Sequence, residues 1–249
     1  MKSRLSQGLA VLSAVGLFSV ATLNAAAITY TGPGTALGSS INDGAGISSV
    51  VINNDANNIT FTINSSQPMA SYIFYTIELQ IVGQAGSGDT SLLNPWGEHI
   101  GFSTGVNSLI NTWGTGASAL TYSGTWTQNA AGNYDAGGTG SSFLTKTFAL
   151  SELGLNVGDS FYFDVVSSYA SPGGQAAYGA LASTGYPAES DNSYQPWLGS
   201  NFYDSATDAT STFGTGATLY TVAVPEPTTM VLVGFGGLLL ACRKFFRRA

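Results

Sequence analysis

The chain has few charged residues, and those it has are unevenly distributed. Charged side chains make up 8% of its 249 residues, against roughly 25% in ordinary soluble domains. Residues 28–224 hold thirteen of the fourteen acidic residues and a single base, Lys146, so one base minus thirteen acids leaves a net charge of −12. Such a segment repels phosphate backbones, because affinity for nucleic acid depends on Lys and Arg. We therefore exclude nucleic acid as a partner.

Cysteine and histidine are almost absent. The only cysteine is Cys242, so residues 28–224 cannot form a disulfide. The only histidine, His99, follows Glu98 on a predicted strand. Neighbouring strand residues point to opposite faces, so Glu98 cannot orient the imidazole for nucleophilic catalysis, and one histidine cannot supply a zinc site. We expect no enzyme, although thirteen acids leave the carboxylate pair of a secreted hydrolase open.

The first 27 residues have the features of a secretory signal peptide. Lys2 and Arg4 supply the positive start, residues 9–23 are apolar and uncharged, and three alanines at 25–27 offer a cleavage site. We expect export through the Sec and signal peptidase machinery, with a mature chain that begins near Ile28. An uncleaved N-terminal membrane helix is the alternative.

The C-terminal segment, 225–249, has three parts: a Pro-Glu-Pro motif, an uncharged run at 228–242 and a basic tail at 243–249. Fifteen helical residues reach about 22 Å, short of the roughly 30 Å hydrocarbon core, so the run alone is a marginal span. The bases that follow it favour a transmembrane helix with the tail in the cytoplasm. Residues 28–224 would then form a domain on the exported side.

This order of parts resembles the PEP-CTERM sorting signal of Gram-negative bacteria. The resemblance covers about the last 25 residues. It implies that an exosortase recognises Pro225, Glu226 and Pro227, and that a basic stop signal follows, formed by Arg243, Lys244, Arg247 and Arg248. It also implies a membrane-anchored intermediate that is delivered to the cell surface or the extracellular exopolysaccharide matrix. A plain single-span anchor is the alternative.

Alternation of apolar and polar residues dominates the segment 28–224. Ile59, Phe61 and Ile63 alternate with polar residues, which places them on one face of a strand. Further predicted strands lie at 47–52, 71–82, 99–103, 119–127, 143–150, 160–168 and 217–224, and only 150–154 could form a helical turn. We predict an all-β fold, a two-sheet antiparallel sandwich that is jelly-roll-like. Residues 148–163 also bear a faint resemblance to carbohydrate-binding and DOMON-like sandwiches.

The segment 171–216 is long for a connection and carries the candidate binding residues. Aromatic rings beside acids and amides suit sugars, and the candidates are Tyr186, Tyr194, Trp197 and Tyr203. Calcium prefers oxygen ligands on turns, and the candidates are Glu189, Asp191, Asp204 and Asp208. The alternatives are that the aromatic residues complete the core and that the acids are solvated.

Together these features predict an exported, noncatalytic protein of the cell surface or matrix. A carbohydrate-binding or calcium-dependent adhesive module is the first alternative, and a secreted hydrolase is the second.

Overall fold

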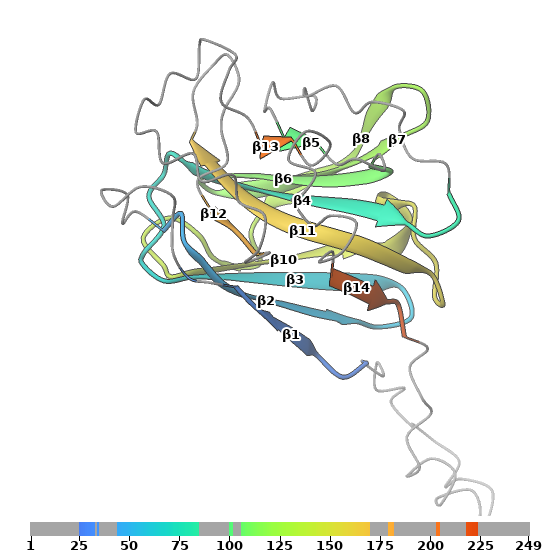
Figure 1. Cartoon of the computed structure of the whole chain (residues 1–249), viewed down its shortest axis with the longest axis horizontal. Coiled ribbons are helices and arrows are strands. Elements are labelled where there is room, and N and C mark those ends of the chain that lie inside the picture. Colours follow the sequence, from blue (N-terminus) through green and yellow to red (C-terminus); the bar gives the residue numbers. More distant parts are fainter. Residues whose placement is uncertain are drawn as a thin grey trace, which may run out of the picture.

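The computed structural model describes residues 25–32, 34, 44–84, 100–101, 106–169, 179–181, 203–204 and 218–223. These residues form β-strands and one turn of 3₁₀ helix, with no α-helix among them. Most of the strands belong to two antiparallel sheets, which confirms the predicted all-β sandwich (Figure 1). The apolar run 9–23 of the predicted signal peptide and the predicted span at 228–242 lie outside the described residues. Within those residues, no helix is long and apolar enough to cross a membrane.

Sheet A has five antiparallel strands. Their order is β1 (Ile28–Thr31), β2 (Ile47–Asn54), β3 (Asn58–Ser65), β10 (Phe143–Ala149) and β9 (Ala136–Gly137). Its outward side chains form neutral cross-strand pairs: the hydroxyl groups of Thr60 and Thr147 are 2.9 Å apart, as are those of Thr62 and Thr145. Hydroxyl pairs of this kind stabilise a sheet without charge.

Sheet B lies on the other side of the core. Its order is β8 (Trp126–Asn133), β7 (Gly116–Tyr122), β6 (Ser108–Trp113), β4 (Ile73–Ile81) and β11 (Ser160–Tyr169), and β12 (Gly179–Ala180) and β14 (Thr218–Thr221) both pair with β11. A separate parallel pair consists of β5 (Ile100–Gly101) and β13 (Tyr203–Asp204).

Three crossings join the two sheets, and one of them leads from β8 in sheet B back to β9 in sheet A. The chain passes from β3 in sheet A to β4 in sheet B, and later from β10 in sheet A to β11 in sheet B. Because β10 is antiparallel to β3 and β11 is antiparallel to β4, the crossings from β3 to β4 and from β10 to β11 join neighbouring strands at opposite ends of the sandwich. The strands β1 to β3 and β6 to β8 are simple meanders instead. These paired crossings are the part of the topology that resembles a jelly roll.

The inner faces of both sheets supply the core. Sheet A contributes the alternate residues of β3, Ile59, Phe61 and Ile63, each at most 1% exposed, as the period-two pattern predicted. Sheet B contributes chiefly the alternate residues of β4 and β11, from Ile73 to Ile81 and from Phe161 to Val165. The burial of these apolar faces is the main favourable term for folding.

One predicted strand is corrected by the structure. Residues 119–127 are two strands of a hairpin: β7 ends at Tyr122, residues 123–125 turn, and β8 begins at Trp126. Gly124 in the turn has φ +87°, a conformation that other residues rarely adopt. The prediction was wrong because the aromatic residues on either side of a short turn resemble one continuous apolar strand. The predicted helical turn is confirmed as the 3₁₀ helix Leu150–Leu153.

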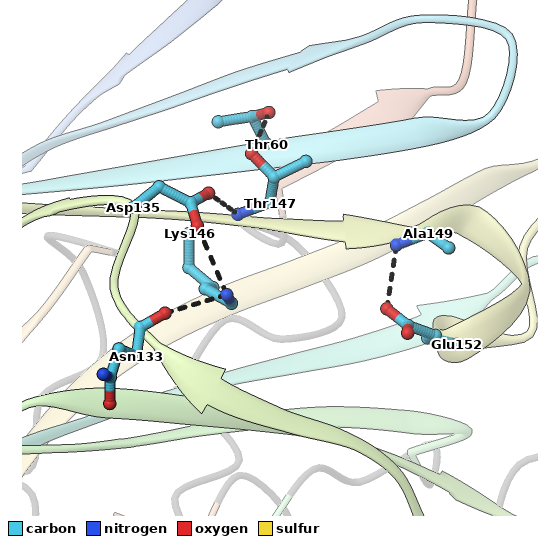
Figure 2. Close-up of polar contacts among 7 residues, drawn as sticks. All are labelled: Thr60, Asn133, Asp135, Lys146, Thr147, Ala149 and Glu152. Atoms are coloured by element: carbon cyan, nitrogen blue, oxygen red, sulfur yellow. Dashed lines mark hydrogen bonds and ion pairs between the residues drawn. The ribbon is translucent and has the colours of Figure 1, made fainter.

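The only base of the segment 28–224 joins the two sheets at an open edge (Figure 2). The Lys146 ammonium on β10 donates to the backbone oxygen of Asn133 on β8 at 2.8 Å and contacts Asp135 Oδ1 at 3.3 Å. Asp135 Oδ2 also accepts from the Thr147 backbone N–H at 2.7 Å. Lys146 therefore neutralises one acid and connects sheet A to sheet B.

Replacing Lys146 by methionine keeps the apolar stem and removes the ammonium group. We expect Lys146→Met to lower the free energy of unfolding by about 1 kcal/mol, because the contacts to Asn133 and Asp135 are lost at a partly exposed site. Urea denaturation of the purified chain measures this loss. An unchanged midpoint would contradict the bridging role.

The pKa of Asp135 predicts an acid-sensitive fold. Burial by itself raises this pKa, but the hydrogen bonds from Thr147 and Lys146 outweigh it and hold the pKa below its ordinary value of 3.8. A carboxyl group with a lower pKa in the folded state stabilises the fold above its unfolded pKa, and this contribution is lost as the pH falls through the folded pKa. We expect urea midpoints to fall below about pH 4, and to fall less in Asp135→Asn. Parallel pH profiles for the two proteins would contradict this prediction.

Candidate functional site

The C-terminal end of the described sandwich is held firmly to sheet B. The strand β14 pairs with β11, and Tyr220 and Val222 are 1% and 0% exposed. Beyond β14, the Val222 N–H donates to the Asp159 backbone oxygen and the Gly158 N–H donates to the Val222 oxygen, both at 2.8 Å. The backbone is therefore bonded to the body of the domain up to the end of its last described segment.

A single buried amide then fixes Ala223. The side chain of Asn54, at the end of β2, donates to the Ala223 oxygen at 3.0 Å and accepts from the Ala223 N–H at 3.1 Å. Its remaining bonds go to the Asp55 oxygen at 2.8 Å and to the Tyr220 hydroxyl, which donates at 2.8 Å. Burial raises the Tyr220 pKa to about 12, so this hydroxyl keeps its proton. Both donors of the amide and both acceptor positions are used.

The N-terminal end of the described domain also contacts Asn54. The Ala25 N–H donates to the backbone oxygen of Asn54 at 2.7 Å, three residues before β1 begins. The Tyr30 hydroxyl on β1 donates to the Leu219 oxygen on β14 at 3.1 Å. The strands at which the chain enters and leaves the sandwich are thus adjacent (Figure 1). We call the contacts of the Asn54 side chain with Tyr220 and Ala223 the terminal clamp.

A second polar feature lies on the face of sheet B that points away from sheet A, which we call the outer face. Glu78 on β4 and Asp164 on β11 are directly opposite each other and each is 2% exposed. Side chains of directly opposed residues have Cβ atoms about 4.5–5.5 Å apart. The only Lys or Arg of residues 28–224, Lys146, lies on sheet A and bonds Asp135. The outer face therefore holds two neighbouring carboxyl groups in a region without lysine or arginine.

The comparisons with known proteins identify the segment that follows the terminal clamp. Residues 223–248 match the family model of the PEP-CTERM protein-sorting motif. The chain carries a PEP-CTERM sorting motif. No curated protein and no solved structure matches the chain.

The PEP-CTERM motif confirms the resemblance found in the sequence and implies exosortase processing. It marks the chain for export and surface sorting in a Gram-negative bacterium. The motif begins at Ala223, the residue that Asn54 holds from both sides, and Pro225 follows two residues later. The sorting signal is therefore attached directly to the folded body, with almost no linker. Its Pro-Glu-Pro residues and its basic residues lie outside the described residues.

Of the residues predicted to bind sugar or calcium, the structure describes only two. Tyr203 and Asp204 form β13, which pairs in parallel with Ile100 and Gly101 of β5. The other candidates lie outside the described residues: Tyr186, Glu189, Asp191, Tyr194, Trp197 and Asp208. In the described ranges, no group of three or more His, Cys, Asp or Glu residues could hold a metal ion. Both sites stay predictions.

Glu78, Asp164 and Asn54 were not singled out from the sequence. A signal for the two acids was present, because each interrupts the middle of an apolar strand, in Thr-Ile-Glu-Leu and in Tyr-Phe-Asp-Val-Val. A lone acid in an apolar strand indicates an unusual environment, since charged residues are almost never buried without a partner. Nothing local marks Asn54, because its partners are 166 and 169 residues away.

Removing the Asn54 side chain should release the C-terminal end of the sandwich. We expect Asn54→Ala to lower the free energy of unfolding by roughly 2–4 kcal/mol, because the buried Tyr220 hydroxyl and both backbone groups of Ala223 lose their partner. Asn64→Ala is the matched control, since it removes one part-buried bond to Ser49, and should cost less than about 1 kcal/mol. Urea denaturation of both variants tests this, and equal losses would contradict the terminal clamp.

Proposed function

We propose that this chain is a noncatalytic component of the cell surface or exopolysaccharide matrix, which an exosortase sorts after export. The match of residues 223–248 to the PEP-CTERM motif carries the proposal. The acidic, base-poor composition of residues 28–224 supports an extracellular structural role, because net charge far from zero favours solubility over self-association.

During sorting, we infer a membrane-anchored intermediate. The signal peptide is removed near residue 27, the run 228–242 spans the membrane, and the basic tail stays in the cytoplasm. Only residues 224–227 separate Ala223 from the span, so the folded domain lies within roughly 18 Å of the membrane surface. The end of the sandwich with the terminal clamp then faces the membrane, and the opposite end faces outward.

The hydrolase alternative can be assessed at one pair of neighbouring carboxyl groups, those of Glu78 and Asp164 on the outer face. Glycoside hydrolysis needs two carboxyl groups that flank a sugar bond with access to water. Glu78 and Asp164 are neighbours, but each is 2% exposed, which leaves no room for a sugar ring and a water molecule between them. Their burial supports the proposed noncatalytic role over the hydrolase alternative.

The sorting proposal is tested by removing the motif and the enzyme separately. In a Gram-negative host that carries an exosortase, the native chain should appear in the surface or medium fraction in a shortened form. Pro225→Ala combined with Glu226→Ala and Pro227→Ala should remain full-length in the membrane fraction, as should the native chain in a host without exosortase. Immunoblots of the fractions measure both results.

Pro187→Ala combined with Glu189→Ala is the control, because it also removes prolyl and acidic residues but leaves the motif intact. It should be sorted like the native chain. Release of the triple variant in shortened form, or release without exosortase, would overturn the assignment.

A further inference from the structure

Most of the exposed apolar side chains of the described residues lie at one end of the sandwich. The strands β4, β10 and β14 finish at this end, on the right in Figure 1, and we call it the clamp end because it holds the terminal clamp. Seven large apolar residues among those described are well exposed, and Tyr72 and Phe143, which precede β4 and begin β10, lie at the opposite end. The other five lie at or near the clamp end: Ile28, Val82, Val157, Tyr162 and Leu219.

Two valines lie at the tip of the clamp end. Val82 directly follows β4, and its N–H donates to the Ser160 oxygen at the start of β11 at 2.9 Å. Val157 lies in the turn before β11, where the Gly158 N–H donates to the Val222 oxygen at 2.8 Å. The two valines are 54% and 37% exposed. They therefore lie beside the point at which the chain leaves the sandwich.

An apolar pair and an aromatic pair extend this surface along sheet B. Tyr162 on β11 and Leu219 on β14 are directly opposite each other, and they are 38% and 47% exposed. The β7–β8 hairpin turns at the same end, because β7 is antiparallel to β6 and β6 is antiparallel to β4. Tyr122 and Trp126 flank this turn with rings 5.3 Å apart in an edge-to-face arrangement, and both are partly exposed. We call these four residues and the two valines the apolar end surface.

The described residues at the clamp end include acids but no lysine or arginine. Asp55 and Asp159 accept hydrogen bonds from backbone N–H groups of their own turns, at 2.7 and 2.8 Å. The only base of residues 28–224, Lys146, bonds the oxygen of Asn133 at the other end of β8. A partner of this end is therefore held by apolar contact and not by attraction to its negative charge.

The membrane is the partner that lies closest to this surface. In the anchored intermediate of the proposed function, only residues 224–227 separate Ala223 from the span, a reach of roughly 18 Å. A short tether gives a high effective concentration, so even a weak contact forms. Tyrosine and tryptophan are enriched at membrane interfaces, and interfacial binding grows with the apolar area that is buried. A bilayer surface therefore fits both the position and the chemistry of the apolar end surface.

We propose that the apolar end surface docks on the lipid interface of the membrane in which the C-terminal segment is anchored. Val82 and Val157 enter the headgroup region, and Tyr122 and Trp126 complete the contact on the hairpin side. Anionic lipids are not needed, because this end has no base to bind them. Docking holds the exit point of the chain at the membrane surface and turns the opposite end outward. The inference rests on the proposed function, because it needs the membrane-anchored intermediate.

The test measures the lipid contact of single fluorophores on the full-length chain in phosphatidylcholine vesicles. Cys242→Ala removes the only native cysteine, and Val82→Cys, Val157→Cys or Phe143→Cys then supplies one site for the dye NBD. Lipids with a doxyl group near the headgroup should quench the dye at 82 and 157 roughly twofold more than the dye at 143. Phe143 is the matched control, because it is 39% exposed, close to the 37% of Val157, but lies at the opposite end.

A second pair of variants tests the contact through charge. With the dye on Ser123→Cys in the hairpin turn, Val82→Asp combined with Val157→Asp should abolish the quenching, because a charge is costly to remove from water. Tyr72→Asp combined with Phe143→Asp makes the same change at the opposite end and should leave the quenching intact. The urea midpoints of both pairs should stay close to that of the parent, since all four substituted residues are exposed.

Carbonate extraction of the vesicles distinguishes this inference from the proposed function. Loss of the chain from the vesicles would mean that the anchored intermediate does not form, and both would be overturned. With the chain retained, three results would overturn the docking alone: equal quenching at 82, 157 and 143, quenching that requires phosphatidylglycerol, or shielding of the dye from water without quenching by lipid. The last result would indicate that a second copy of the chain covers the surface.

Discussion

The packing of two apolar sheet faces against each other is the interaction on which the rest of the structure depends. Residues 28–224 contain no cysteine and one base, so neither disulfides nor ion-pair networks can hold the sandwich together. The inner faces of β3, β4 and β11 are almost completely buried, and they supply the stabilisation that covalent links supply in other small exported domains. Neutral hydrogen bonds, such as the paired threonines of sheet A, complete it.

Scarcity of charge makes a few polar side chains unusually important. The side-chain amide of Asn54 holds the C-terminal end of the described domain, and Lys146 joins the sheets where their edge is open. The terminal clamp also has a consequence for sorting, because the PEP-CTERM motif begins at a residue whose two backbone groups are already bonded to the fold. The first residue of the sorting motif is therefore part of the folded domain.

The two sheets differ on the sides that face away from the core. Sheet A presents part-buried threonine pairs, which satisfy one another. Sheet B carries the buried acids Glu78 and Asp164, and a partly exposed aromatic pair, Tyr122 and Trp126, at the end of its hairpin. The sides of the two sheets that face away from the core therefore differ in charge, since the buried acids lie on sheet B.

The sequence by itself determined what depends on local pattern. The order of Pro-Glu-Pro, apolar run and basic tail identified the sorting motif, and period-two alternation located β3 and the strands around it, because both signals lie within a few consecutive residues. Only the tertiary structure decided which distant residues meet. Asn54 reaches Ala223 across 169 residues, Glu78 lies beside Asp164, and Tyr122 meets Trp126 through a turn that looked like continuous strand. Strand pairing sets these contacts, and its register depends on the packing of the whole core rather than on any short segment.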